Sequence, residues 1–497
     1  MTTATASATT DHPRWSPRLW GTLVVLCAAL FLDALDVSMV GVALPSIRTD
    51  LDLSTSSLQW VVSGYVLGYG GLLLLGGRAA DLLGRRRVFL VALAVFAVAS
   101  LLGGLVDDGG LLIATRFVKG VAAAFTAPAG LSIITTTFKE GHERNRALSI
   151  YSTCGACGFS LGLVLSGLLT EAGWRWTFLM PFPLALIALF AGIRLIPKQA
   201  TAPREGRGYD LAGAVTATGG LLLLVYTVTQ AQGVGWGSLR TALSLIAVAV
   251  LFTAFIRIEQ RTAHPLVRLG ILRNGPVARA NLGAIALFGA YVGFQFIATL
   301  YLQTLLGWSA LEMALGFLPA GVIVAASAVK MGALVDRFGT TKLMLIGFPA
   351  ALLGYANFLR IGEHGDYLTV ILPSMVLIGA HFALVFPALN IQATTGVADA
   401  EQGLASGLVN TAFQVGGATV LAVVTAVVTA GATGSGGGKQ AQLAGYHHAL
   451  GVVTGVAALG LLVTVTGAVL NRRAARSVRH PVPDYALPAQ ERVGAVD

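Results

Sequence analysis

Four ionisable side chains lie inside long apolar stretches of the sequence. Asp33 and Asp36 interrupt one stretch, and Arg116 and Lys119 interrupt another. A charge in such surroundings is costly unless an opposite charge is near, and it commonly belongs to an ion or proton path. Burial favours a protonated carboxyl group and a nearby cation favours the ionised one, so together they allow proton loading and release. We predict proton coupling by Asp33, Asp36 and Arg116, in which Arg116 stays charged and biases the two carboxyl groups, with a structural salt bridge or hydrogen bond as the alternative.

A second set of polar side chains occurs in other apolar stretches and predicts a binding cavity. Lys119 could titrate when desolvated or simply pair with an aspartate. His381 could titrate near neutral pH. Polar groups between helices are packing contacts about as often as ligands, so both interpretations stay open. The predicted cavity residues are Tyr65, Lys119, Tyr291, Gln295, His381, Asn410 and Gln414.

Acidic residues are sparse in the apolar stretches of the second part of the chain. Glu312 lies near the end of its stretch, where a solvated loop position is the simpler interpretation. With no central carboxylate there, the pattern favours a neutral or monocationic substrate over a dicationic one.

The composition requires lipid around these residues. The chain has 497 residues, of which 55% are hydrophobic and only 11% are charged, and its mean hydropathy is +0.76. These values are too apolar for a water-soluble globule. Inside a bilayer every backbone polar group needs a partner within its own segment, so we predict an all-α integral membrane bundle.

Apolar runs of membrane-spanning length occur about fourteen times. The first run contains two aspartates and is full length, so we do not expect it to be cleaved as a signal peptide. The predicted spans are 19–41, 58–76, 88–106, 111–136, 147–170, 176–196, 211–231, 239–256, 280–305, 313–332, 343–359, 367–390, 403–430 and 449–470.

The net charge of +10 comes from basic residues in the short connections between spans. Most of them fall in alternate connections, which indicates the cytoplasmic face and not a nucleic-acid site. We therefore predict a multi-pass protein of the cell (inner) membrane with both termini in the cytoplasm. The basic residues predicted on the opposite face are Arg48, Arg175, Arg240, Arg360 and Lys439.

One loop pattern occurs twice along the chain. The stretches 77–87 and 332–342 both place an aspartate and a glycine at the same spacing. A parallel repeat of this kind predicts two related halves with a cavity between them. The predicted parts are a tail (1–18), a six-helix half (19–197), a linker with two extra helices (198–279), a second six-helix half (280–470) and a tail (471–497).

Several motifs resemble the major facilitator superfamily, in particular its fourteen-span drug:proton antiporters, from about Leu19 to Leu470. Gly77 to Arg86 resembles the loop motif G-x-L-A-D-R-x-G-R-K. Leu35 to Pro45 resembles L-D-x-T-I-V-N-V-A-L-P, with Gly41 in place of Asn. Arg116 to Gly120 resembles the proton-transfer motif R-x-x-Q-G, with Lys119 in place of Gln. The resemblance implies two pseudo-symmetric six-helix halves plus two extra helices.

The resemblance also implies residues that control conformation. Gly158, Gly162 and Gly167 match the glycines of the family's antiporter motif, where Leu163 replaces a proline. Even without a special role, such small residues let another helix approach closely. The loop motif implies a latch between the two halves. Its residues are Gly77, Asp81, Gly84, Arg85 and Arg86 in the first copy and Asp336, Arg337 and Gly339 in the second.

The resemblance implies a proton-coupled exporter of amphipathic drugs, antiseptics or antibiotics that works by alternating access. Its partners would be small amphipathic or cationic substrates, protons and membrane lipid, and we expect a monomer. No phosphate-binding G-x-x-x-x-G-K-[ST] occurs, so we expect no ATP, no other cofactor, no metal and no enzyme activity. Cys154 and Cys157 are interpreted as packing residues. The alternatives are a transporter of one specific metabolite, and a membrane sensor or lipid-moving protein.

Overall fold

The computed structural model describes residues 15–139, 142–198, 210–235, 237–262, 269–328, 330–397, 402–434 and 438–477, and its elements in these ranges are all helices. The first helix group comprises α1 (Pro17–Asp50), α2 (Thr55–Leu83), α3 (Arg85–Leu105), α4 (Gly109–Thr137), α5 (His142–Ala172), α6 (Trp176–Leu179) and α7 (Pro181–Leu195). A hairpin of α8 (Leu211–Val234) and α9 (Leu239–Arg261) follows.

The second helix group begins after a short 3-10 turn, η1 (Leu269–Arg273). Its members are α10 (Gly275–Thr299), the π-helical η2 (Leu300–Leu305), α11 (Ala310–Ala328), α12 (Met331–Phe338), α13 (Thr340–Phe358), η3 (Tyr367–Ile371), α14 (Leu372–Thr394), α15 (Gln402–Gly434) and α16 (Lys439–Ser477).

Eleven helical segments of the described residues are long and apolar enough to cross a membrane. A shorter apolar stretch in α8, together with α2 and α13, accounts for the remaining predicted spans. The predicted all-helical membrane architecture is confirmed. The boundaries of the predicted linker stay a prediction, because 199–209 and 263–268 lie outside the described residues.

Polar caps set several helix starts. The side chains of Ser16, Ser54 and Asp108 accept hydrogen bonds from backbone N–H groups in the first turns of α1, α2 and α4, which satisfies donors that have no partner within a helix. At the duplicated loops, Gly84 and Gly339 both have positive φ, 93° and 75°. Glycine adopts this conformation without a steric penalty, so the two copies of the loop turn the chain in the same way.

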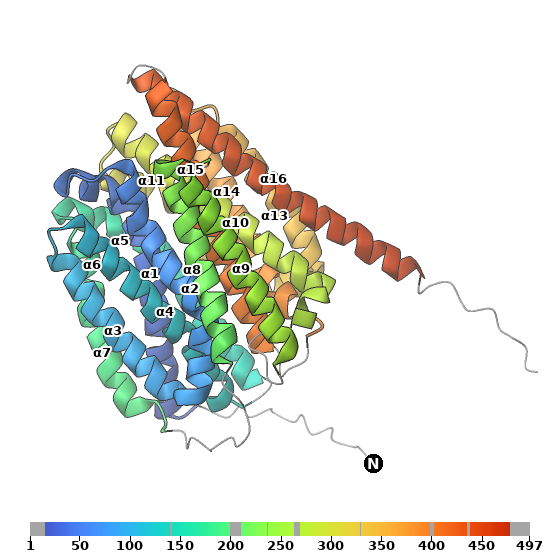
Figure 1. Cartoon of the computed structure of the whole chain (residues 1–497). Coiled ribbons are helices and arrows are strands. Elements are labelled where there is room, and N and C mark those ends of the chain that lie inside the picture. Colours follow the sequence, from blue (N-terminus) through green and yellow to red (C-terminus); the bar gives the residue numbers. More distant parts are fainter. Residues whose placement is uncertain are drawn as a thin grey trace, which may run out of the picture.

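Figure 1 shows the first helix group on the left, most of the second on the right, and α8 and α9 in front of the seam. Across this seam α5 packs against α11, and α2 packs against α15. The hairpin contacts both groups, because α8 packs on α2 and on α15. A Cβ atom at Gly71 of α2 would lie only 2.8 Å from Leu222 of α8. The hairpin therefore covers one side of the seam.

Glycines bring the helices of the first group close together. A Cβ atom at Gly120 of α4 would lie 2.1 Å from the carbonyl oxygen of Tyr65 in α2. A Cβ atom at Gly158 of α5 would lie 2.5 Å from the carbonyl oxygen of Phe31 in α1. Small residues at such positions let two backbones approach within contact distance. This packing sets where α1, α2 and α4 place their polar side chains.

Candidate functional site

A buried cluster of charges joins α1 to α4. Asp36 forms ion pairs with both Arg116 and Lys119, and each carboxylate oxygen accepts from a different cation. Asp36 and Lys119 are fully buried and Arg116 is 2% exposed. The Nε atom of Arg116 also donates to the carbonyl oxygen of Val61, at 3.0 Å. Asp36 lies about 80 residues before the two cations in the sequence, and the fold brings them into contact.

The two cations have different surroundings although they lie three residues apart on α4. The guanidinium of Arg116 lies 4.7 Å from the ring centre of Tyr65. The ammonium of Lys119 lies 4.9 Å from the ring of Phe96 and 5.4 Å from that of Phe178. Aromatic faces attract cations, so both positive charges gain contacts beyond their shared carboxylate. Lys119 is enclosed within the first helix group.

Asp33 lies one turn before Asp36 on α1 and is also buried. It accepts a hydrogen bond from the hydroxyl group of Thr126 on α4, at 3.1 Å. No cation within ion-pair distance of Asp33 is present among the described residues. The two carboxyl groups therefore have different partners, two cations for Asp36 and one hydroxyl group for Asp33.

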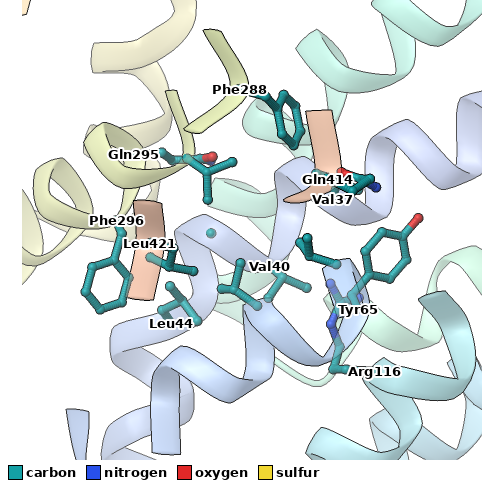
Figure 2. Close-up of a pocket in the computed structure, with 14 residues that line it drawn as sticks. Val37, Val40, Leu44, Tyr65, Arg116, Phe288, Gln295, Phe296, Gln414 and Leu421 are labelled. Carbon is teal, nitrogen blue, oxygen red and sulfur yellow. The ribbon is translucent and has the colours of Figure 1, made fainter. Parts of the chain in front are cut away.

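The first cavity lies between the two helix groups and contains about 540 Å³ of empty space, part of it open. Four of its fourteen lining residues are polar, namely Tyr65, Arg116, Gln295 and Gln414, and the others are apolar or glycine. Figure 2 shows Arg116 beside Tyr65 at one end and Gln295 at the opposite side. Arg116 thus belongs both to this cavity and to the ion cluster.

The second cavity also lies between the helix groups and contains about 380 Å³ of empty space, part of it open. Its wall is largely apolar and aromatic. Tyr291 lies here, with ring centres 5.7 Å from Phe159 and 5.2 Å from Phe382. Leu163, at the position of the family's proline, lines the same cavity. Phe159 and Phe382 could not be predicted from the sequence, because aromatic residues are common in lipid-facing and packed helices alike.

Three predicted cavity residues do not line either of these cavities. Lys119 is enclosed with Asp36, as described above. His381 is 1% exposed, and its Nδ1 atom lies 3.0 Å from the carbonyl oxygen of Gly347 on α13. Asn410 donates to the carbonyl oxygen of Ser406 in its own helix, at 2.9 Å. In the second helix group, α14 and α15 are oriented so that the side chains of His381 and Asn410 make packing contacts.

The first loop motif contacts its own helix group. Arg86 donates to the carbonyl oxygens of Ile196 and Ile193, at 2.9 and 2.6 Å, near the end of α7. Arg85 donates to the carbonyl oxygen of Ser132 in α4, at 3.5 Å. Carbonyl groups at helix ends lack helical partners and attract cations. These contacts lie within the first helix group, and the latch between the two halves stays a prediction.

Other residues of the loop motifs make fewer contacts. A Cβ atom at Gly77 would meet Pro128 at an ordinary 3.7 Å. Asp336 and Arg337 of the second copy are exposed, and the Arg337 guanidinium lies 5.3 Å from the ring of Phe338. The side chain of Asp81 lies outside the described residues.

The two helix groups meet closely near the end of the bundle where α1 stops at Asp50, which we call the Asp50 side. The Nε2 atom of Gln303 in η2 donates to the carbonyl oxygen of Val42 in α1, at 2.8 Å. A Cβ atom at Gly167 of α5 would lie 2.7 Å from the Cβ atom of Ala314 in α11. Gly162 of α5, predicted from the antiporter motif, packs on α1 within the first helix group. No pattern in the sequence distinguishes Gln303 from other polar residues.

Charged loops on the Asp50 side brace the first helix group. Arg175 forms ion pairs with Asp50 and Asp107, at 2.6 and 2.5 Å, and Trp174 donates to Asp50 at 2.9 Å. The hydrogen bond to Asp50, together with Asp107, raises the pKa of Arg175. The guanidinium therefore stays charged and holds the end of α1 against the loops that precede α4 and α6.

These observations define a polytopic helical membrane protein with cavities between two helix groups and a buried ion cluster beside one of them. The model of the Major Facilitator Superfamily matches residues 26–421. The chain therefore belongs to the Major Facilitator Superfamily, a family of transporters, and the resemblance found in the sequence is confirmed.

Relatives match along nearly the whole chain. The puromycin resistance protein pur8 of Streptomyces alboniger is 38% identical over 462 residues, which cover 90% of both chains. The cephamycin export protein CmcT of Amycolatopsis lactamdurans is 36% identical and covers 95% of this chain and 96% of its own. Among solved structures, the POT family transporter PepTSo matches with a TM-score of 0.67 and 18% identity, over 93% of this chain and 99% of its own. That likeness shows the fold alone.

Proposed function

We propose that this protein is a secondary transporter that exports antibiotics or related amphipathic drugs from the cell in exchange for protons. One observation carries the proposal. Arg116 lines the first cavity and is also paired with the buried Asp36. A change in the charge of Asp36 therefore changes the electrostatic interactions of Arg116 at the cavity wall. The names of the two relatives, one for puromycin resistance and one for cephamycin export, support antibiotics as the cargo.

The coupling follows from the charges in the cluster. Protonation of Asp36 removes the negative charge that holds Arg116 and Lys119, so both cations lose their partner in a buried place. Without this partner Arg116 moves away from Asp36, and its movement changes the shape of the cavity beside Tyr65. Protons and cargo thereby favour different arrangements of the two helix groups, which is what alternating access needs. Asp33, one turn away on α1, is placed to pass protons to or from this cluster.

The remaining parts of the proposal concern the setting of the protein. It lies in the cell membrane as a monomer, with both termini in the cytoplasm, as the distribution of Lys and Arg favours. The proton gradient supplies the energy, without a cofactor and without catalysis. Cargo enters the cavity from the cytoplasm and leaves from the Asp50 side.

Asp36→Asn tests the proposal because it keeps the size of the side chain and removes the titratable charge. The protein is reconstituted in liposomes, a pH gradient is imposed, and transport of radiolabelled puromycin is followed together with proton movement. We expect the gradient-driven transport to be abolished. The matched control is Asp107→Asn, which alters an exposed carboxylate on the Asp50 side and should transport normally. Undiminished transport by Asp36→Asn would exclude Asp36 as the coupling residue.

A further inference from the structure

The first cavity contains a buried amide nitrogen that has no hydrogen-bond partner among the described residues. Gln295 of α10 lines this cavity and is 7% exposed, and its Nε2 atom bonds to none of the described residues. Buried polar atoms in proteins almost always have a partner. An unpartnered amide in a cavity wall is therefore a candidate contact for a ligand.

The position of this amide depends on a glycine in the opposite helix group. A Cβ atom at Gly41 of α1 would lie 2.6 Å from the Nε2 atom of Gln295. The amide thus occupies the space that any larger residue at position 41 would fill. Gly41 stands where the family motif has an asparagine, so this chain replaces a side chain from α1 with one from α10. The polar contact is contributed from the second helix group.

The charges around the first cavity have one sign. None of its fourteen lining residues is Asp or Glu, and the fixed charge on its wall is the guanidinium of Arg116. Asp36 is engaged by two cations behind that wall. In the described part of the second helix group, carboxylates lie at helix ends and loops, namely Glu312, Asp336, Glu363 and Asp366. A cationic cargo would meet repulsion here without a counter-ion.

We propose that the first cavity selects uncharged amphipathic molecules that carry an acceptor oxygen, in a carbonyl or sulfonyl group, and that Gln295 is the residue that recognises this oxygen. The carbonyl or sulfonyl oxygen accepts a hydrogen bond from the amide nitrogen of Gln295. Val40, Phe288 and Leu421 contact the apolar part of the cargo, and Tyr65 and Gln414 provide further uncharged polar contacts. This inference deepens the proposed function and rests on it, since it names the class of cargo for the same cavity.

Two probes that share one fluorophore test the charge preference. Dansylamide is uncharged, and dansylaminoethyl-trimethylammonium is a permanent cation. Binding of each to the purified protein in detergent is measured from the dansyl fluorescence. We expect the wild type to bind dansylamide at least about tenfold more tightly than the cation, as electrostatic selection against a wrong partner requires. Equal or tighter binding of the cation would overturn the proposal.

Two variants of Gln295 test its role. Gln295→Leu removes the amide at similar volume and should weaken dansylamide binding about tenfold, the effect of one lost neutral hydrogen bond. Gln295→Glu adds the missing carboxylate and should reverse the preference toward the cation. Gln392→Leu is the matched control and should bind like wild type, because Gln392 is buried and lines a separate pocket with Arg279 and Asn471. Unchanged dansylamide binding in folded Gln295→Leu would overturn the assignment.

The outcome is independent of the proton assay. Probe binding is measured without a gradient, whereas the Asp36→Asn experiment depends on one. Undiminished transport by Asp36→Asn together with the expected probe preference contradicts only the proton coupling. Abolished transport by Asp36→Asn without the probe preference contradicts only the class of cargo.

Discussion

At the scale of single residues, the two cations of the ion cluster have different roles. Arg116 lines the first cavity, whereas Lys119 is enclosed by the rings of Phe96 and Phe178. An intact buried ion pair adds little net stability, but the loss of one partner leaves an uncompensated charge. Lys119 therefore holds Asp36 in place, and Arg116 connects Asp36 to the cavity.

Lys119→Met is expected to lower the free energy of unfolding by about 1–3 kcal/mol, because one carboxylate oxygen of the buried Asp36 loses its hydrogen-bond donor while Arg116 still compensates the charge. Lys119→Gln keeps a hydrogen-bond donor and should lose less. Thermal unfolding of the purified variants measures both effects. Arg175→Gln is the comparison on the surface, where the loss of an exposed pair costs about 1 kcal/mol at most. An unchanged unfolding temperature for Lys119→Met would show that Asp36 does not need this lysine.

At the scale of elements, the contact of α1 with α5 positions Asp36. A Cβ atom at Gly162 would lie 2.0 Å from the hydroxyl oxygen of Ser38 and 2.8 Å from the carbonyl oxygen of Leu35. These two residues flank Asp36 on α1. The backbone of a packed helix cannot yield locally, so a larger residue at 162 must push the helices apart.

Gly162→Ala is expected to destabilise the protein by about 1–3 kcal/mol, the usual range for overpacking, and to reduce transport because α1 carries Asp36. Gly451→Ala in α16 is the matched control, since a Cβ atom there meets nothing within 4 Å. That control should gain about 0.5–1 kcal/mol from helix propensity. Thermal unfolding and puromycin transport are measured for both variants. Equal transport by Gly162→Ala and wild type would contradict the inference that close packing at Gly162 positions Asp36.

At the scale of the whole molecule, the contacts on the Asp50 side hold the two helix groups together. Gln303 comes from a π-helical segment, a form of helix that is frequent at functional sites. Its hydrogen bond to the carbonyl oxygen of Val42 lies close to Pro45, which has no N–H for the carbonyl of Gly41. The bond therefore joins the second helix group to a part of α1 in which one backbone hydrogen bond is missing.

Gln303→Leu is expected to increase the population that is open on the Asp50 side about fivefold, which corresponds to about 1 kcal/mol for one hydrogen bond. Spin labels at Thr49 and Glu363, both exposed on that side in different helix groups, report the distance between the groups. The labels require a variant without Cys27, Cys154 and Cys157. Gln392→Leu serves as the control. A distance distribution identical to that of wild type would show that this bond does not stabilise the closed arrangement.

Local signals in the sequence determined the class of the protein. Long apolar runs predicted membrane helices because a backbone in lipid must satisfy its hydrogen bonds within the segment. The paired loops around Gly84 and Gly339 predicted a repeat, and both glycines adopt the same kind of turn. Such features depend on neighbouring residues, so they can be read without the fold.

The tertiary structure alone decided which polar residues meet. Gln295 and His381 both look like polar residues in apolar runs, yet one lines a cavity and the other packs on Gly347. The difference arises from the rotation and approach of helices, which contacts between distant segments determine, such as Gly41 with Gln295. Arg85 and Arg86 of the first loop likewise contact their own helix group, where Arg86 meets carbonyl groups at the end of α7 and Arg85 meets the carbonyl group of Ser132 in α4. These contacts between distant residues cannot be predicted from the spacing of the residues along the chain.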